Sequence, residues 1–155
     1  MAKLTVSVQK DDFDPGQLQE ALLVGASEEG AVATFTGYVR VNNDHRGVSR
    51  MMMEHYPGMT ENSIASTLDE AAQRWPILAA AVVHRIGELR PGERIVWVGV
   101  SSRHRGGSFS ACEYIMDYLK TNAPFWKKEI GPQGEHWVDA RDTDSDRARR
   151  WQVSE

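Results

Sequence analysis

Six basic residues stand close to the ends of expected helices and strands, and their side chains are types that bind anions and move protons. They are Arg40, His104, Arg105, Lys120, Lys127 and Lys128. Binding and catalytic groups concentrate at element ends on a rigid scaffold, because side chains there reach a ligand without disturbing the core. Short basic stretches in a chain of net charge -4 suit a local anionic ligand.

Lys120 is the candidate with the clearest chemistry. A lysine that is crowded by other cations and partly desolvated has a lowered pKa and can act as a base or nucleophile near neutrality. The expected position at the C-terminal end of a helix acts in the opposite direction, because the helix dipole favours the ammonium form there. The sequence leaves open both a catalytic lysine and an ordinary helix-terminal lysine. For Lys127 and Lys128, adjacent positions on a strand point to opposite faces, so at most one of them is expected in a shared site.

Several other kinds of chemistry are disfavoured. The acidic balance argues against a general nucleic-acid binder. Walker A, dinucleotide-binding, HExxH and GxSxG motifs are missing from the sequence. The single cysteine, Cys112, falls on an apolar helical stripe, which favours a core thiol over a reactive one. No metal site is expected, because four histidines lie far apart and none pairs with another at metal-ligand spacing: His45, His55, His84 and His136. No cofactor is expected either.

The length and composition predict one compact domain over residues 1–155, with a densely charged C-terminal tail from about residue 142 that is either a solvated helix or frayed. The sequence shows neither a signal peptide nor an apolar run of the roughly 18 residues that a membrane span needs. We therefore expect a cytoplasmic protein that does not bind membranes.

Strands are predicted at 4–8, 30–39, 51–56, 79–86 and 94–101, with a turn at 90–93 joining the last two and a polar loop at 42–47. Residues 125–130 and 135–138 predict a hairpin. Helices are predicted from Pro15 to about residue 22, from a cap at Thr60 to before Pro76, and from about residue 106 to before Pro124. The third helix carries an apolar stripe of Phe109, Cys112, Ile115, Met116 and Leu119. Helices mixed with hairpins indicate an α+β fold.

Six separated segments of the sequence resemble the molybdopterin synthase large-subunit family, and they occur in the expected order. They are FTGYVR at 35–40, EHYPGMT at 54–60, HRIGEL at 84–89, SRHR at 102–105, MDYLK at 116–120 and APFWKKE at 123–129. The resemblance spans residues 30 to 141.

This resemblance implies an α/β hammerhead-type domain with antiparallel hairpins, and a homodimer that carries one small ubiquitin-like subunit at each outer end, giving a heterotetramer. In that family the small sulfur-carrier subunit ends in a thiocarboxylate, and its tail enters a pocket of the large subunit. Two sulfurs are delivered to cyclic pyranopterin monophosphate to form the dithiolene of molybdopterin.

Carried over residue by residue, the resemblance makes Lys120 and Lys127 the catalytic lysines. Arg40, His104 and Arg105 are expected to hold the phosphate and the pterin. The remaining expected substrate-binding residues adjoin these in the sequence: Tyr38, Val39, Lys128 and Glu129. Arginine suits a phosphate, lysine suits proton transfer, and fixed cations stabilise an oxyanion.

Two further hypotheses come from other classes of protein. One is a noncatalytic scaffold that captures the tail of a ubiquitin-like carrier by strand addition. The other is a small nucleic-acid-binding domain, which the acidic balance disfavours.

Overall fold

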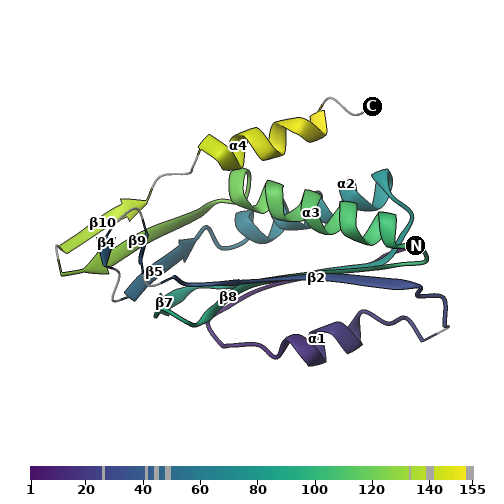
Figure 1. Cartoon of the computed structure of the whole chain (residues 1–155), viewed down its shortest axis with the longest axis horizontal. Helices are drawn as coiled ribbons and strands as arrows, with labels where there is room; N and C mark the ends of the chain where they lie inside the picture. The colour runs from purple at the N-terminus through teal and green to yellow at the C-terminus, as the bar shows by residue number, and fades with distance from the viewer. Residues whose placement is uncertain are drawn as a thin grey trace.

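A computed structural model of the chain describes residues 1–25, 27–40, 42–43, 46–47, 50–132, 134–138 and 142–152. Its first sheet has the strand order β1-β6-β8-β2 and is drawn in Figure 1 as the long central layer. The strands are β1 (Lys3–Gln9), β2 (Ala31–Tyr38), β6 (Ile77–Arg85) and β8 (Arg94–Ser102). The pair β1 and β6 is parallel, and the other two pairs are antiparallel.

The second sheet is entirely antiparallel, with the strand order β10-β9-β5-β7. Its strands are β5 (Arg50–His55), β7 (Gly87–Leu89), β9 (Phe125–Gly131) and β10 (Gly134–Val138). In the predicted loop, β3 (Asn42–Asn43) pairs with β4 (Arg46–Gly47); His45 lies outside the described residues. The two sheets with their helices confirm the predicted α+β class.

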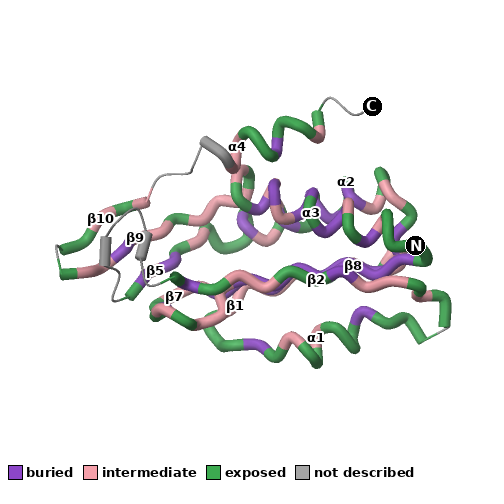
Figure 2. Tube along the Cα trace, viewed as in Figure 1, coloured by how far each residue is buried: buried purple, intermediate pink, exposed green. Residues whose placement is uncertain are grey.

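The helices lie on both faces of the first sheet (Figure 1). Helices α2 (Met59–Arg74) and α3 (Arg105–Thr121) cover one face and enclose the main core, whereas α1 (Pro15–Ala21) covers the other face over a smaller core. Figure 2 shows buried residues along the strands of the first sheet and on parts of α2 and α3. Within the described ranges, no helix is long and apolar enough to cross a membrane.

The second helix begins two residues earlier than the predicted cap at Thr60 implies, and its cap is a different residue. The N-cap is Gly58, whose φ of 86° lies in the left-handed region that glycine adopts without strain. The backbone N–H of Gly58 donates to the Glu61 carboxylate at 2.9 Å, which replaces a side-chain cap. Thr60 is buried inside the first turn, and its hydroxyl donates to the Pro124 carbonyl at 2.9 Å.

The predicted stripe of the third helix is partly wrong. Cys112, Ile115 and Leu119 are buried, but Phe109 is 65% exposed. The buried residues of α3 lie on a face centred near Ser108, and Phe109 lies about 100° away from Ser108 around the helix axis. The helix also begins at Arg105, slightly earlier than expected.

The predicted direct turn from β6 to β8 contains an additional strand. After β6 the chain passes from the first sheet to the second, where β7 pairs with β5. Met51 lies opposite Leu89, and Met53 lies opposite Gly87. Leu89 is fully buried in a small core between the two sheets, together with Val39 and the two methionines. This burial explains why the connecting residues form a strand of the second sheet.

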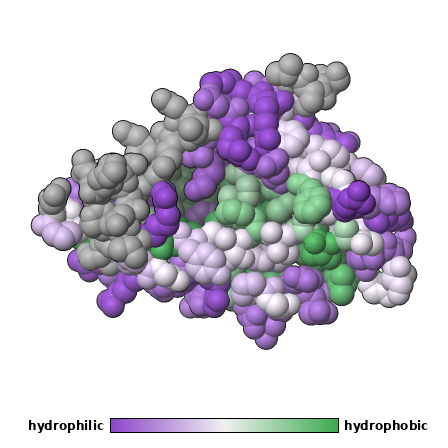
Figure 3. All heavy atoms as spheres, in the orientation of Figure 1, coloured by the Kyte–Doolittle hydropathy of each residue, from purple (hydrophilic) through white to green (hydrophobic). Residues whose placement is uncertain are grey.

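The charged C-terminal segment forms a helix, which was one of the two predicted alternatives, but this helix is not simply solvated. Helix α4 (Asp142–Arg149) and the 3-10 turn η1 (Arg150–Gln152) pack on α3. Buried Asp117 of α3 accepts hydrogen bonds from Arg147 Nε at 3.3 Å, Arg150 Nη2 at 3.0 Å and Trp151 Nε1 at 2.7 Å. We call these four residues the Asp117 cluster. In Figure 3 the hydrophilic surface of α4 lies beside a band of hydrophobic residues over α3.

Candidate active site

A cavity of about 250 Å³ lies where the first sheet, the second sheet and the C-terminal end of α3 meet. The lining combines basic, acidic and apolar side chains from both sheets, α3 and α4. Its members are Tyr38, Val39, Arg40, Met51, Met53, His84, Ile95, Val96, Met116, Leu119, Lys120, Ala123, Phe125, Lys127, Glu129, Val138 and Asp144. Its volume is close to the lower end of the range for small-molecule sites.

Three of the six predicted basic residues meet in this cavity. Arg40 comes from the segment after β2, Lys120 from the last turn of α3, and Lys127 from β9. Two carboxylates, Glu129 and Asp144, also line the cavity. The expected convergence of Lys120 and Lys127 on one cavity is therefore observed.

The position of Arg40 depends on the turn before β8. Val39 is buried, its N–H donates to the Glu93 carbonyl at 2.9 Å, and its carbonyl accepts from the Gly92 N–H at 2.8 Å. Tyr38, which precedes it, is 55% exposed at the rim. These backbone hydrogen bonds fix the direction in which the chain presents Arg40.

The alternation of β9 separates the two adjacent lysines, as the sequence predicted. Lys127 lines the cavity together with Phe125 and Glu129, each two residues away. Lys128 is on the opposite face, where its Nζ lies 3.4 Å from Glu135 Oε2 and 5.1 Å from the centroid of the Trp137 ring. The structure therefore does not bring Lys128 into the cavity.

Buried Glu129 completes the acidic part of the lining. Its Oε1 lies 3.3 Å from His136 Nε2 on the neighbouring strand β10. From the sequence, Glu129 was expected at the site because it adjoins Lys127. In the structure, Glu129 lines the cavity because it lies two residues from Lys127, on the same face of β9.

His84 is a cavity residue that the sequence reasoning missed. Its ring stacks on Phe125 with centroids 3.8 Å apart, and its Nδ1 lies 2.8 Å from the Arg85 carbonyl oxygen. Burial, together with the charges of Lys120 and Lys127, lowers the pKa of His84 to about 4. The available signal was a histidine directly after the apolar run AAAVV, a pattern that predicts a buried histidine but gives no hint of a cavity.

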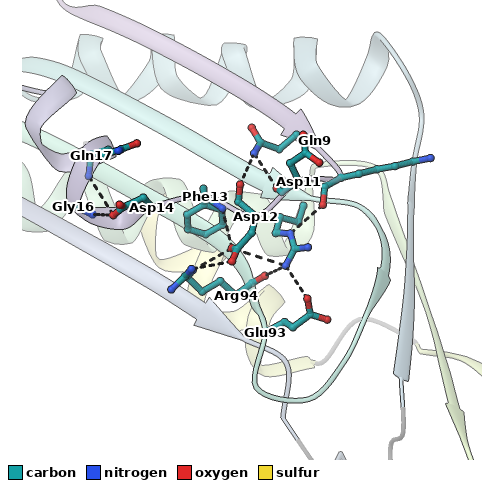
Figure 4. Close-up of polar contacts among 11 residues, drawn as sticks. Gln9, Asp11, Asp12, Phe13, Asp14, Gly16, Gln17, Glu93 and Arg94 are labelled. Carbon is teal, nitrogen blue, oxygen red and sulfur yellow. Dashed lines mark hydrogen bonds and ion pairs between the residues drawn. The ribbon is translucent and has the colours of Figure 1, made fainter.

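The backbone beside His84 is held by a polar network at the end of the first sheet. Arg85 donates from Nε to the Lys10 carbonyl at 3.1 Å and from Nη1 to the Arg94 carbonyl at 3.0 Å. Arg94 forms an ion pair with Asp12 at 2.8 Å, as Figure 4 shows, and hydrogen bonding to Arg94 is the main cause of the lowered pKa of Asp12. Through this network, the side chain of Arg85, next to His84, links β6 to the segment after β1 and to β8.

The structure places His104 and Arg105 far from the cavity within one chain. His104 is the N-cap of α3, and Arg105 is the first residue of that helix. At 1.5 Å per residue, the axial separation between Arg105 and Lys120 is about 22 Å. Both residues are exposed on the surface. The expectation that they share the cavity with Lys120 is not met by a single copy of the chain.

Cys112 is buried, as predicted, and its Sγ lies 3.9 Å from the Val98 carbonyl oxygen. Burial raises the pKa of its thiol to about 12, so the reactive thiolate is scarce near neutral pH. Among the described residues, no group of three or more histidine, cysteine, aspartate or glutamate side chains is arranged to hold a metal ion.

These features define an α+β protein with a cavity, lined in part by basic side chains, at the junction of its two sheets. The family described as "MoaE protein" matches residues 8–122, and the chain belongs to this family. The chain is 55% identical over 149 residues to the molybdopterin synthase catalytic subunit of Ralstonia nicotianae, covering 96% of this chain and 85% of that one.

Solved structures agree with this assignment. The molybdopterin biosynthesis MoaE protein from Burkholderia ambifaria superposes with a TM-score of 0.82 at 48% identity, covering 99% of this chain and 100% of that one. A complex of subunits 1 and 2 of molybdopterin-converting factor from Helicobacter pylori has a TM-score of 0.72 at 18% identity, covering 88% and 91%. At that identity the likeness is one of fold alone. The family resemblance predicted from the six sequence segments is confirmed.

Proposed function

We propose that this chain is the catalytic subunit of a molybdopterin synthase. It transfers sulfur from the C-terminal thiocarboxylate of a small ubiquitin-like subunit to cyclic pyranopterin monophosphate, forming the dithiolene of molybdopterin. The observation that carries the proposal is the presence of Lys120, Lys127 and Arg40 in one cavity of a MoaE family member.

The cavity has the chemistry that this reaction requires. The thiocarboxylate sulfur attacks a carbon of the heterocycle, and water then cleaves the acyl–sulfur bond of the resulting thioester, leaving the sulfur on the heterocycle and a carboxylate on the carrier. Negative charge develops on the acyl oxygen during this cleavage, and nearby ammonium groups stabilise that charge. Lys120 and Lys127 are the catalytic lysines in this proposal, and they also transfer protons. Arg40, with its planar guanidinium, binds the phosphate. Tyr38, Val39 and Glu129 complete the substrate site, whereas Lys128 lies on the other face of β9.

A second copy of the chain completes the site in this proposal. His104 and Arg105 are exposed at the N-terminal end of α3, about 22 Å along the helix from Lys120. That distance excludes a direct role in the cavity of their own chain, but an exposed helix end can reach the cavity of a neighbouring chain. The active assembly is then a homodimer that binds one small subunit at each cavity, which makes a heterotetramer.

The small subunit brings the sulfur, so the chain needs no reactive cysteine of its own. Cys112 is buried and has a raised pKa, which agrees with a reaction in which the small subunit supplies the sulfur. The Helicobacter pylori neighbour in fold is itself a complex of two subunits. We assign the reaction to the cytoplasm.

The test reconstitutes the reaction from purified components. The chain is incubated with thiocarboxylated carrier and cyclic pyranopterin monophosphate, and dithiolene product is measured by mass spectrometry. Carrier with an ordinary C-terminal carboxylate is the control, and only the thiocarboxylate form is expected to give product. Carrier binding without any product would instead support the noncatalytic scaffold, and absence of both would overturn the proposal.

A further inference from the structure

One nitrogen of the His84 ring is held by the protein, and the other faces the cavity. Because the Arg85 carbonyl can only accept a hydrogen bond, Nδ1 at 2.8 Å must carry the proton. Nε2 therefore has a lone pair, and no hydrogen-bond partner for it is found among the residues that the structure describes. Every fully enclosed side-chain nitrogen or oxygen in that part of the chain has a partner. Nε2 is consequently reached from the cavity that His84 lines.

The direction of this lone pair is fixed by the surrounding structure. The residue is only 8% exposed, and its ring stacks on Phe125 at an interplanar angle of 19°. Its strand neighbours are Val8 of β1 and Val96 of β8. A buried ring held on one side by a hydrogen bond and on one face by an aromatic ring is preorganised to bind a ligand atom.

His84 differs in kind from the other polar groups that line the cavity. The lysines and the arginine are donors only, and the two carboxylates are anionic acceptors. His84 is a neutral acceptor near neutrality, because burial and the neighbouring ammonium groups disfavour its protonated form. A phosphorylated heterocycle has both an anionic group for the cations and ring N–H groups that need an acceptor.

We infer that His84 sets the specificity of the cavity for the heterocycle: its Nε2 accepts a hydrogen bond from a ring N–H group of the ligand while the cations bind the phosphate. This inference rests on the proposed function. A site with a buried acceptor discriminates against ligands without the matching donor, because the acceptor is then left desolvated and unpaired.

Two amide substitutions test the roles of the two ring nitrogens separately. In His84→Asn, the amide nitrogen can replace Nδ1 as donor to the Arg85 carbonyl, but nothing replaces Nε2. In His84→Gln, the longer side chain carries an amide oxygen to about the position of Nε2. We expect His84→Asn to weaken binding of cyclic pyranopterin monophosphate about tenfold, and His84→Gln to weaken it by less than about threefold. Binding of inorganic phosphate should be unchanged in both, as measured by calorimetry.

A measurement on the unmodified protein keeps the test independent of how the variants fold. The nitrogen NMR resonance of His84 Nε2 should shift when cyclic pyranopterin monophosphate is titrated into the protein, and it should not shift with inorganic phosphate. A purely structural histidine would give no such difference.

The outcomes distinguish this inference from the proposed function. If the wild-type protein binds the heterocycle but the Nε2 resonance stays in place, or if His84→Asn binds it as tightly as wild type, the role of His84 is overturned and the proposed function stands. If the wild-type protein does not bind the heterocycle at all, both are overturned.

Discussion

Two regions near the C-terminal end of α3 use basic side chains differently. In the Asp117 cluster, a buried carboxylate accepts hydrogen bonds from two arginines and a tryptophan of the C-terminal segment. One turn further along the helix, Lys120 lines the cavity, and among the described residues no hydrogen bond or ion pair to its ammonium group is found. Cations that bind a buried carboxylate hold the C-terminal segment in place, whereas a cation beside an open cavity remains available to a ligand.

The largest expected effect is on catalysis at the cavity. Lys120→Ala should reduce dithiolene formation by at least about 100-fold, because a positioned proton-transfer group contributes a factor of that order or more. The melting temperature should change little, since Lys120 is exposed and the substitution leaves no buried group unpaired. Turnover and thermal unfolding are measured on the same preparation.

The matched control for this variant is Lys128→Ala, on the face of β9 away from the cavity. We expect its turnover to stay within about threefold of wild type, since surface charges of this kind contribute little. Near-normal product formation by Lys120→Ala would remove that residue from the mechanism and weaken the contrast between the two regions.

The second prediction concerns the stability of the cavity wall at low pH. Burial lowers the pKa of His84 from 6.5 to about 4, so between these pH values the unfolded chain binds a proton that the folded chain does not. The free energy of unfolding should therefore fall as the pH decreases from 6.5, by up to about 3 kcal/mol, and this contribution should level off below about pH 4. Urea unfolding at a series of pH values measures the slope.

His84→Gln is the control for this pH dependence, because its amide does not titrate. Its free energy of unfolding should depend less steeply on pH in the same window. Parallel slopes for wild type and variant would show that the histidine titrates alike in the folded and unfolded chains.

The smallest expected effect is on the anchoring of the C-terminal segment. Asp117→Ala should lower the free energy of unfolding by about 2 kcal/mol, because it leaves the Trp151 indole N–H and two guanidinium groups without their shared acceptor. Faster amide hydrogen exchange in residues 142–152 is expected as well.

Asp146→Ala removes a carboxylate of the same segment that pairs with Arg149 on the exposed surface. Its effect should stay within about 0.5 kcal/mol, since exposed ion pairs contribute little. Equal losses for the two variants would mean that burial of Asp117 does not set its importance.

Local patterns in the sequence predicted most of the elements. Asp14 and Pro15 predicted the start of α1, and the Asp14 carboxylate indeed accepts from the Gly16 N–H at 2.9 Å. The rule of alternation on a strand predicted the divergence of Lys127 and Lys128. These features depend on interactions within a few residues, which the order of residue types largely determines.

Features that depend on distant contacts were predicted less well. The exposure of Phe109 depends on the angle at which α3 meets the sheet, and the helical period alone permits several angles. The role of the charged segment depends on Asp117, which lies about 30 residues before Arg147. His84 became a cavity residue only because β9 brings Phe125, Lys127 and the end of the first sheet together.

By itself, the sequence determined the fold class, the family and the basic residues that are able to act on an anion. Tertiary structure decided which of those cations share a cavity, placing Arg40, Lys120 and Lys127 together and His104 and Arg105 at the other end of α3. The physical reason is that residue type sets the charge and hydrogen-bonding capacity of a side chain. Its neighbours, and hence its solvation and partners, are set by the packing of elements that are distant in the sequence.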